Sequence, residues 1–290
     1  MTSTLPEFDS LWNYDDPAST EVKFRQLIPQ AEKSGNIIYH AQLLTQLART
    51  QGLQRKFDDA HKTLDKALQL IATGNVTGRI RYLLERGRVF NSSNQPGKAR
   101  PLFLEAYEEA LTHNEDFYAI DAAHMLGIVD KGEDSLKWNE RAIELAEISK
   151  DQRAKKWLGS LYNNTGWTYH DNMDYEKALD YFLRNVTWHK ERGSKKPLII
   201  AKWSVARTFR SMDRITEAFD IQMNLLKELG QMKLEQDGYV FEEIGECLLA
   251  LNRKDESKEY FKKAYELLSK DIWLEANEEE RLERMKSLSE

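Results

Sequence analysis

Residues 166–182 of this 290-residue chain read GWTYHDNMDYEKALDYF. A small residue, Gly166, is followed twelve positions later by a second small residue, Ala178, and four positions after that by Phe182. The first small residue recurs at steps of 39 or 40 positions, at Ala48, Gly87, Gly127, Gly166, Ala206 and Gly245. The second recurs at Ala60, Ala99, Ala178, Ala218 and Ser257. A spacing this regular indicates an internal repeat.

The two columns of small residues predict pairs of antiparallel helices. Helices pack about 8–10 Å apart, and they approach most closely where the residues in contact are small. A polar turn separates the two columns, as at Asp171-Asn172-Met173-Asp174. In the third repeat the turn is compressed, because Ser135 follows Gly127 by only eight positions. Six helix pairs are therefore predicted.

The composition agrees with a helical protein and excludes several other classes. The 14 Gly and 6 Pro are too few for a many-stranded sandwich or barrel, which needs frequent turns. The 7 Trp, 12 Tyr and 11 Phe supply enough apolar surface for a core, so disorder of the whole chain is excluded. The net charge of −6 argues against nucleic-acid binding, which requires an excess of Lys and Arg.

The expected location follows from what the sequence lacks. No apolar run approaches the roughly 20 residues that span a bilayer, and residues 1–15 lack the basic and apolar parts of a signal peptide. Cys247 is the single cysteine, which excludes an internal disulfide framework and fits a reducing compartment. We therefore expect a cytoplasmic protein with no membrane partner.

In its repeats the chain resembles the tetratricopeptide repeat (TPR) family, in a long-period variant of about 40 residues rather than 34. The resemblance covers residues 36–270 and implies an all-α fold, a right-handed superhelical α-solenoid of stacked antiparallel helix pairs. The customary proline after the second helix is missing. The matching residues are Gly166-Trp167-Thr168-Tyr169 with Ala178 and Phe182, Gly87 to Phe90 with Ala99, Phe103 and Ala106, and Gly245 with Phe261 and Ala264.

The two ends of the chain lie outside the helix pairs. Residues 1–16 are expected to form an N-terminal tail with little order. The TPR-like solenoid is expected over residues 17–270, and it opens with a lone helix over 17–35. Residues 271–290 are expected to form a C-terminal capping helix, which covers the last core face with one side and presents a polar side to solvent.

By resemblance to the family, one stripe of each first helix faces a concave groove where ligands bind. At 100° per residue, this stripe contains the positions six and three before the first small residue and one and four after it. In the first five repeats it carries six Lys or Arg against one acid, although the whole chain is acidic. The candidate ligand-binding residues, which include Asn164 beside the stripe, are Arg49, Arg81, Arg88, Asn91, His124, Asn163, Asn164, Trp167, His170, Trp203, Arg207 and Arg210.

These residue types predict a binding function. Arginine forms bidentate bonds to carboxylates, tryptophan is a favoured anchor, and an amide both donates and accepts hydrogen bonds. We expect a non-catalytic adaptor or scaffold whose groove binds a protein or peptide partner, with an acidic or carboxylate-bearing segment as ligand. The candidate binding residues are most closely grouped in the groove at Trp167, Trp203, Arg207 and Arg210. The structural alternative is that the arginines pair with acids on neighbouring helices and the tryptophans stabilise the stack.

Other functions stay open or receive less support. One alternative is a receptor for a short signalling peptide, and another is a structural subunit of an oligomeric assembly. Trp12, Trp138, Trp157 and Trp188 are candidates for a contact between copies in a homo-oligomer. Asp121 and His124 share a helix face where an acid-oriented base is conceivable, but no motif for catalysis, a metal or a cofactor occurs. We therefore expect no enzymatic activity, no metal and no cofactor.

Overall fold

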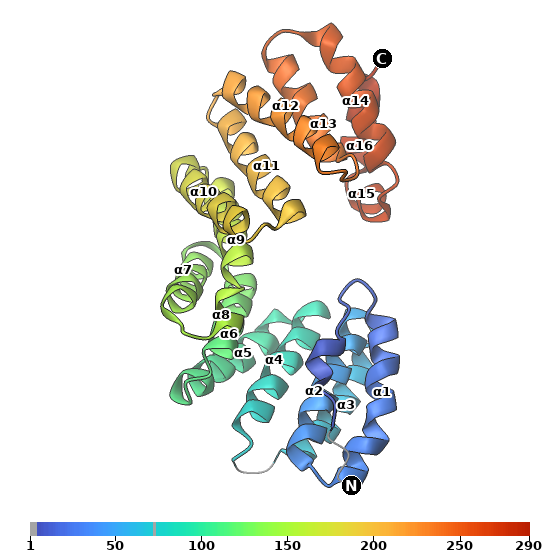
Figure 1. Ribbon diagram of the computed structural model, residues 1–290, viewed down its shortest axis with the longest axis vertical. Helices are drawn as coiled ribbons and strands as arrows, with labels where there is room; N and C mark the ends of the chain where they lie inside the picture. The colour runs from blue at the N-terminus through green and yellow to red at the C-terminus, as the bar shows by residue number, and fades with distance from the viewer. Residues whose placement is uncertain (1–4, 72–73) are drawn as a thin grey trace. The chain divides into compact units, whose positions relative to one another are not determined.

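The computed structural model describes residues 5–71 and 74–290, and within these ranges the chain contains helices and no β-strand (Figure 1). The helices fall into two compact units. Unit 1 ends at Trp157, and unit 2 begins at Leu158. No helix in the described ranges is both long enough and apolar enough to cross a membrane.

Unit 1 is a stack of antiparallel helix pairs preceded by a lone helix. A 3₁₀ turn, η1 (Phe8–Leu11), leads to the lone helix α1 (Pro17–Ser34). The pairs and a final short helix are α2 (Ile37–Leu53) with α3 (Phe57–Leu70), α4 (Val76–Ser92) with α5 (Pro96–Thr112), α6 (Asp116–Val129) with α7 (Gly132–Ile148), and α8 (Gln152–Lys155).

Unit 2 continues the same architecture with three further pairs and two short terminal helices. These are α9 (Leu158–Asp171) with α10 (Tyr175–Glu191), α11 (Lys195–Ser211) with α12 (Ile215–Gln231), α13 (Gly238–Ala250) with α14 (Lys254–Leu268), then α15 (Ile272–Asn277) and α16 (Glu279–Leu288). The predicted all-α fold of stacked antiparallel helix pairs is therefore confirmed within each unit.

The small residues of the first column receive large side chains from the second helix of the pair. A Cβ atom added to Gly166 would lie 2.5–2.9 Å from three ring atoms of Phe182, which is fully buried. Gly87 stands in the same relation to Phe103, and Gly245 to Phe261. Where the first column holds alanine, at Ala48 and Ala206, the second helix carries Leu64 and Gln222 instead of phenylalanine. A pair of glycine with phenylalanine and a pair of alanine with a smaller side chain thus fill the same space between the two helices.

The turn inside a pair also repeats. The middle residue of its three-residue loop adopts the left-handed conformation, with φ close to 60° at Arg55, Asn94, Met173, Asp213 and Asn252. These positions are spaced by 39 or 40 residues, or by twice that across the third pair. In the third pair the turn is shorter, Gly132 has φ 60°, and the Ser135 hydroxyl donates to the Gly127 carbonyl at 2.6 Å.

Helix α1 is a second helix without a first. Phe24 lies 40 positions before Leu64, at the repeat position that Phe103, Phe182 and Phe261 take in later pairs. Like those residues, it is fully buried. The N-terminal segment covers it, with ring centroids 6.3 Å apart for Phe8 and 5.4 Å apart for Trp12. Residues 5–16, which we expected to have little order, are therefore part of unit 1, and their aromatic side chains cover the end of its core. Residues 1–4 lie outside the described residues.

The C-terminal segment forms two helices where one capping helix is expected. The backbone leaves the helical conformation at Glu278, with φ −135°, and α16 then packs against α14. Met285 lies 40 positions after Gly245, is fully buried, and shares a core cluster with Phe261. Helix α16 thus takes the place that the first helix of a further pair would occupy, and it covers the end of the core.

The tryptophans that we considered for self-association all pack within the chain. Trp12, Trp138, Trp157 and Trp188 are each part-buried. Trp138 lies edge-on against Tyr107 with centroids 5.1 Å apart, and Trp157 lies 5.2 Å from His124. Trp12 packs on Phe24, and Trp188 lies beneath the Arg192 guanidinium.

Candidate binding surface

The first helices of unit 1 bring three of the predicted arginines to one surface. Arg49 on α2 donates to Glu85 on α4 at 3.0 Å, and Arg88 donates to the same oxygen at 2.8 Å. Arg88 also pairs with Asp121 on α6. The side chains of Glu85 and Asp121 are only 4% and 6% exposed. Arg49 and Arg88 are therefore matched by acids of the neighbouring first helices, as the structural alternative predicts.

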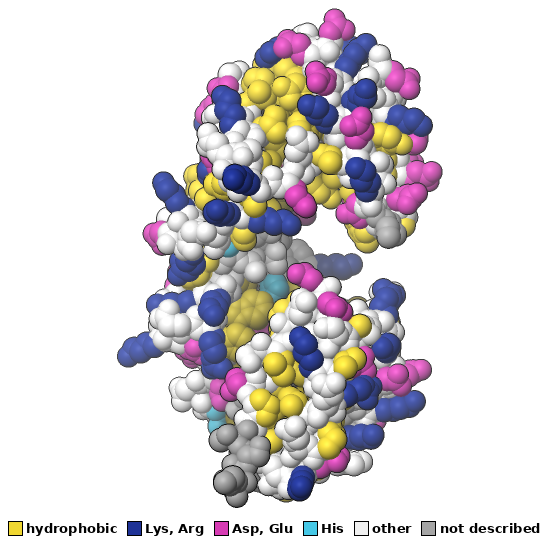
Figure 2. All heavy atoms as spheres, turned by 45° about the vertical axis from the view of Figure 1, so that its right-hand side comes forward, with side chains coloured by type: hydrophobic (Ala, Val, Ile, Leu, Met, Phe, Trp, Pro, Cys, Tyr) yellow, Lys and Arg dark blue, Asp and Glu magenta, His cyan; other side chains and the backbone are white. Residues whose placement is uncertain are grey.

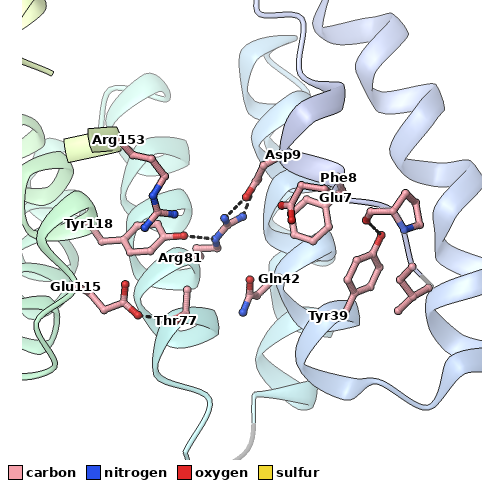
Figure 3. Close-up of a pocket in the computed structure, with 12 residues that line it drawn as sticks. Glu7, Phe8, Asp9, Tyr39, Gln42, Thr77, Arg81, Glu115, Tyr118 and Arg153 are labelled. Carbon is pink, nitrogen blue, oxygen red and sulfur yellow. Dashed lines mark hydrogen bonds and ion pairs between the residues drawn. The ribbon is translucent and has the colours of Figure 1, made fainter. Parts of the chain in front are cut away.

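The third arginine, Arg81, is matched by a residue from outside the repeats. Its guanidinium forms a bidentate pair with the Asp9 carboxylate of the N-terminal segment, one of the two bonds measuring 3.0 Å (Figure 3). Its Nε donates to the Tyr118 hydroxyl at 2.7 Å. Burial by itself lowers the pKa of Arg81, but the hydrogen bonds to Asp9 and Tyr118 and their charges raise it above its usual value. Arg81 is thus a buried, permanent cation.

The two remaining candidates of unit 1, Asn91 and His124, take no part in these pairs of arginines with acids. Asn91 lies part-buried in the last turn of α4. His124 packs on Trp157, and its buried Nδ1 has no partner among the described residues. Burial lowers the pKa of His124, so the ring is neutral at pH 7. Asp121, the acid that we placed beside it, is held by Arg88 instead.

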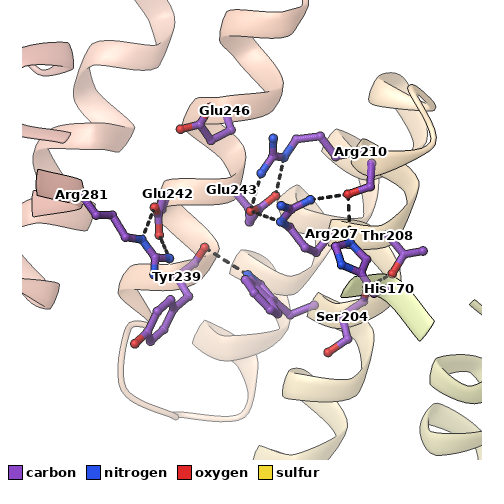
Figure 4. A network of polar contacts seen from close by, with 12 residues as sticks. His170, Ser204, Arg207, Thr208, Arg210, Tyr239, Glu242, Glu243, Glu246 and Arg281 are labelled. Carbon is purple, nitrogen blue, oxygen red and sulfur yellow. Dashed lines mark hydrogen bonds and ion pairs between the residues drawn. The ribbon is translucent and has the colours of Figure 1, made fainter. Parts of the chain in front are cut away.

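In unit 2, three aromatic rings from successive first helices form a row. Trp167 on α9 lies 5.8 Å from Trp203 on α11, and Trp203 lies 6.2 Å from Tyr239 on α13, between ring centroids. The Trp203 indole N–H donates to the Tyr239 carbonyl at 3.1 Å, which fixes its ring (Figure 4). All three rings are part-buried.

Beside this row, two predicted arginines share one carboxylate. Arg210 binds Glu243 in a bidentate manner at 2.7 and 2.9 Å, and Arg207 reaches the same carboxylate at 3.2 Å (Figure 4). Arg207 and His170 both hydrogen-bond to the Ser211 hydroxyl, at 2.5 and 2.9 Å. Burial, and then the charge of Arg207, lower the pKa of His170. Burial also lowers the pKa of Arg207, although Glu243 opposes that shift.

The two candidate asparagines lie one turn before Trp167. The Asn163 side-chain amide donates to the Asn164 side-chain oxygen at 3.5 Å. The Asn163 oxygen is itself buried without a hydrogen-bond partner among the described residues. We define the unit 2 surface as the side chains of five residues on α9, α11 and α13, namely Trp167, His170, Trp203, Arg207 and Tyr239.

Two of the acids that hold the arginines lie outside the stripe defined from the sequence. Glu85 and Glu243 lie two positions before the first small residue, just outside the stripe that we counted. In both units an arginine one position after the small residue pairs with a glutamate 36 positions later, Arg49 with Glu85 and Arg207 with Glu243. A search for opposite charges at this distance, three short of the period, would have found both pairs.

Neither a thiol nor a metal cluster adds chemistry to these surfaces. Cys247 is buried, and burial raises the pKa of its thiol to about 12, so it is not a nucleophile at pH 7. Among residues 5–71 and 74–290, no group of three His, Cys, Asp or Glu side chains is arranged to hold a metal ion. Basic and acidic side chains are interspersed over the face shown in Figure 2.

Known proteins share this fold at low sequence identity. The family model described as Tetratricopeptide repeat matches residues 240–269. The apo form of RapI is similar over 91% of this chain and 76% of its own, with TM-score 0.71 and 10% identity. A tetratricopeptide repeat protein from Parabacteroides merdae covers 98% of this chain and 96% of its own, with TM-score 0.54 and 17% identity. NprR in complex with its cognate peptide NprX covers 97% and 81%, with TM-score 0.54 and 15% identity. No curated protein sequence matches the chain.

Proposed function

We propose that this chain, which matches the tetratricopeptide-repeat model over residues 240–269 and shares the fold of tetratricopeptide-repeat proteins, binds an extended segment of another protein, without catalysis, on the unit 2 surface. The observation that carries this proposal is the row formed by Trp167, Trp203 and Tyr239. Part-buried aromatic rings lose little side-chain entropy when a ligand covers them, and tryptophan and tyrosine dominate the energetics of protein interfaces. Three such rings on successive helices present a continuous strip to an extended chain.

We also propose that the segment carries a carboxylate. Arg207 and Arg210 share the single carboxylate of Glu243, so this cluster has one positive charge more than its own acid supplies. Arg210 already uses two N–H groups on Glu243, whereas Arg207 makes one contact of 3.2 Å to it. Arg207 is therefore the guanidinium that a ligand carboxylate would engage, directly beside the aromatic row. We propose that Asn163 and Asn164, one turn before Trp167, bind the peptide backbone.

The test is a selection of peptides from a random library on the immobilised chain, followed by titration of the selected peptides. Acidic and aromatic residues should be enriched. Arg207→Gln should weaken the selected peptides about 10- to 100-fold, the usual loss for a hydrogen bond to a charged group. Trp167→Ala should weaken them as well. We choose Arg207→Gln over charge reversal of both arginines, because changing Arg210 would leave the buried Glu243 without its main partner.

The matched control is Arg214→Gln at the N-cap of α12, an exposed arginine whose ion pair is with Glu217 and whose guanidinium lies over the Phe209 ring. It removes the same charge outside the surface and should leave binding unchanged. Equal affinity of wild type, Arg207→Gln and Trp167→Ala for the selected peptides would refute this site. Enrichment of basic peptides would refute the proposed preference for a carboxylate.

A second candidate function is that of a receptor for a short signalling peptide. The similarity to NprR, whose structure contains its cognate peptide, favours it. The two functions differ in what they bind. A receptor should show a saturable thermal shift with one free peptide of fewer than about ten residues, whereas an adaptor should bind the same segment within a folded partner.

A further inference from the structure

We propose that the Asp9 segment, residues 5–12, is an internal ligand in a second peptide site, formed by α2, α4 and α6 of unit 1, and that an acidic–aromatic segment of a partner protein binds there by displacing it. This site is separate from the unit 2 surface, so the inference stands or falls independently of the function proposed above.

The backbone of the segment is bound by a side chain, as the backbone of a peptide ligand is. The Tyr39 hydroxyl on α2 donates to the Pro6 carbonyl at 2.9 Å. Phe8 is the first anchor: its side chain is 4% exposed and its ring lies 5.1 Å from that of Tyr39. Both contacts are made to the first turn of α2, by Pro6 just before η1 and by Phe8 at its start (Figure 3).

The acidic side chain of the segment binds a cation that the fold prepares for it. The Arg81 guanidinium lies between two rings, 5.4 Å from the Phe8 centroid and 5.5 Å from the Tyr118 centroid. The Tyr118 hydroxyl fixes its Nε, and the two terminal nitrogens face the Asp9 carboxylate (Figure 3). The Arg81 side chain is 9% exposed and that of Asp9 39%. A buried guanidinium strongly favours a carboxylate partner, because an unpaired buried charge is costly.

Trp12 is the second anchor. Its indole N–H donates to the Gln46 side-chain oxygen on α2 at 3.0 Å, and the Arg49 guanidinium lies 5.9 Å from its ring. The segment therefore presents the pattern aromatic–acid–x–x–Trp to residues of the predicted groove stripe, among them Arg49 and Arg81. This is the acidic ligand that the arginine-rich stripe predicts, supplied by the chain itself.

The charges of the surface explain why the displacing segment must be acidic. Three arginines, Arg49, Arg81 and Arg88, face two acids that belong to the helices, Glu85 and Asp121. Asp9 is the third acid. When the segment leaves, its replacement must bring a carboxylate to Arg81.

A purely structural cap does not require these contacts. The end of the core is covered by Phe8 and Trp12, which contact Phe24, together with Leu11. The bond of Pro6 to Tyr39 on α2 and the pair of Asp9 with Arg81 on α4 do not add to that cover. Beside the segment, a cavity of about 440 Å³ lined by Gln42, Thr77 and Arg153 leaves room for an entering chain before the segment has left.

The experiment measures binding of a fluorescent, end-capped peptide with the sequence of residues 5–14, LPEFDSLWNY, to the full chain by anisotropy. The tethered segment competes at millimolar effective concentration, so wild type should bind the peptide weakly. Asp9→Asn in the chain removes the charge-assisted pair and should raise the affinity for the peptide at least about tenfold. Asp9→Asn combined with Arg81→Gln should abolish that gain.

The matched control is Asp9→Asn combined with Arg79→Gln. Arg79 lies on the same helix but pairs with Glu105 and Glu109 of α5, so this variant should bind like Asp9→Asn alone. A folded Asp9→Asn chain that binds the peptide no better than wild type would overturn the proposal and make the segment a cap. Dimerisation of Asp9→Asn without peptide binding would also overturn it, in favour of exchange of the segment between copies.

A second measurement uses the wild-type chain, so that the test does not depend on whether a variant folds. Hydrogen exchange at residues 5–12 of wild type should accelerate when the unlabelled peptide is added in large excess, while the buried turns of α2 and α4 stay protected. The same peptide with asparagine in place of its aspartate should have no such effect. Equal acceleration by both peptides, or by neither, would contradict a site that recognises the carboxylate.

Discussion

Replacing Gly166 by alanine should destabilise unit 2, although alanine favours a helix. The new Cβ atom would lie 2.5, 2.7 and 2.9 Å from Cε1, Cδ1 and Cζ of Phe182. The ring is fully buried and also packs against Trp167, with centroids 5.1 Å apart, so it has nowhere to move without disturbing a second ring. The strain therefore falls on the spacing between α9 and α10.

The magnitude follows from two opposing effects. Inserting a methyl group into a filled core costs about 1–3 kcal/mol, and alanine gains about 1 kcal/mol over glycine in a helix. Because the added Cβ would overlap three atoms of a buried ring, we take the upper part of that cost, about 2–3 kcal/mol, and expect Gly166→Ala to lower the free energy of unfolding by about 1–2 kcal/mol. Phe182→Leu alone should cost about 1–2 kcal/mol for the space it leaves. Together they recreate the pair Ala48 and Leu64 of the first repeat, in which the methyl group fills that space.

The assay is a double-mutant cycle in urea, followed by circular dichroism. Because the methyl group and the smaller side chain compensate each other, the double variant should be more stable than the sum of the single changes by about 1–2 kcal/mol. The control is Gly230→Ala in α12, where an added Cβ meets nothing within 4 Å. That change should be neutral or stabilising. If Gly166→Ala behaves like the control, or if the two changes at 166 and 182 are additive, the explanation of the repeat columns is wrong.

Three further predictions concern single side chains. Gln222→Leu should stabilise the chain by about 1–2 kcal/mol in urea denaturation, because Gln222 is fully buried with both polar side-chain atoms unpartnered among the described residues; equal or lower stability would show that the amide is satisfied. Met173→Asn should raise stability by about 0.5–1 kcal/mol in thermal unfolding, since Met173 is 75% exposed with φ 60°, a conformation that asparagine tolerates better; a drop would contradict strain at this turn. His124→Phe should make stability less sensitive to acid, measured as the difference in unfolding free energy between pH 7.5 and 5. The folded pKa of His124 is lowered by burial, so the unfolded chain takes up the proton first as pH falls through its ordinary pKa of about 6.5, and wild type loses stability in that window. An identical loss in the variant would contradict a buried neutral ring.

Much of the fold could be predicted from the sequence, because the same few positions in each repeat make the contacts between its two helices. The steps of 39 or 40 residues located the six helix pairs, and the short distance from Gly127 to Ser135 located the compressed turn. The relation between Gly166 and Phe182 is local in the sense that one turn separates the two helices. Such contacts recur at fixed distances along the chain and can be read from one sequence.

Contacts between a repeat and a segment outside the repeats could not be predicted from the sequence. Asp9 and Arg81 are 72 positions apart, and no periodicity relates them. The break at Glu278 was also missed, since no proline or glycine marks it in the sequence. For the unit 2 surface, the stripe predicted from the sequence contained Trp167, Trp203 and Arg207. It did not contain Glu243, which binds Arg207 and lies one position away from the stripe.

The central claim is that the first helices of unit 2 bind an extended, carboxylate-bearing segment. Hydrogen exchange of the full chain with and without a saturating selected peptide tests it most directly. The account predicts slower exchange in α9, α11 and α13, no change in α10, α12 and α14, and loss of the protection in Arg207→Gln at the same peptide concentration. Protection confined to the second helices, or protection that Arg207→Gln retains in full, would contradict the claim.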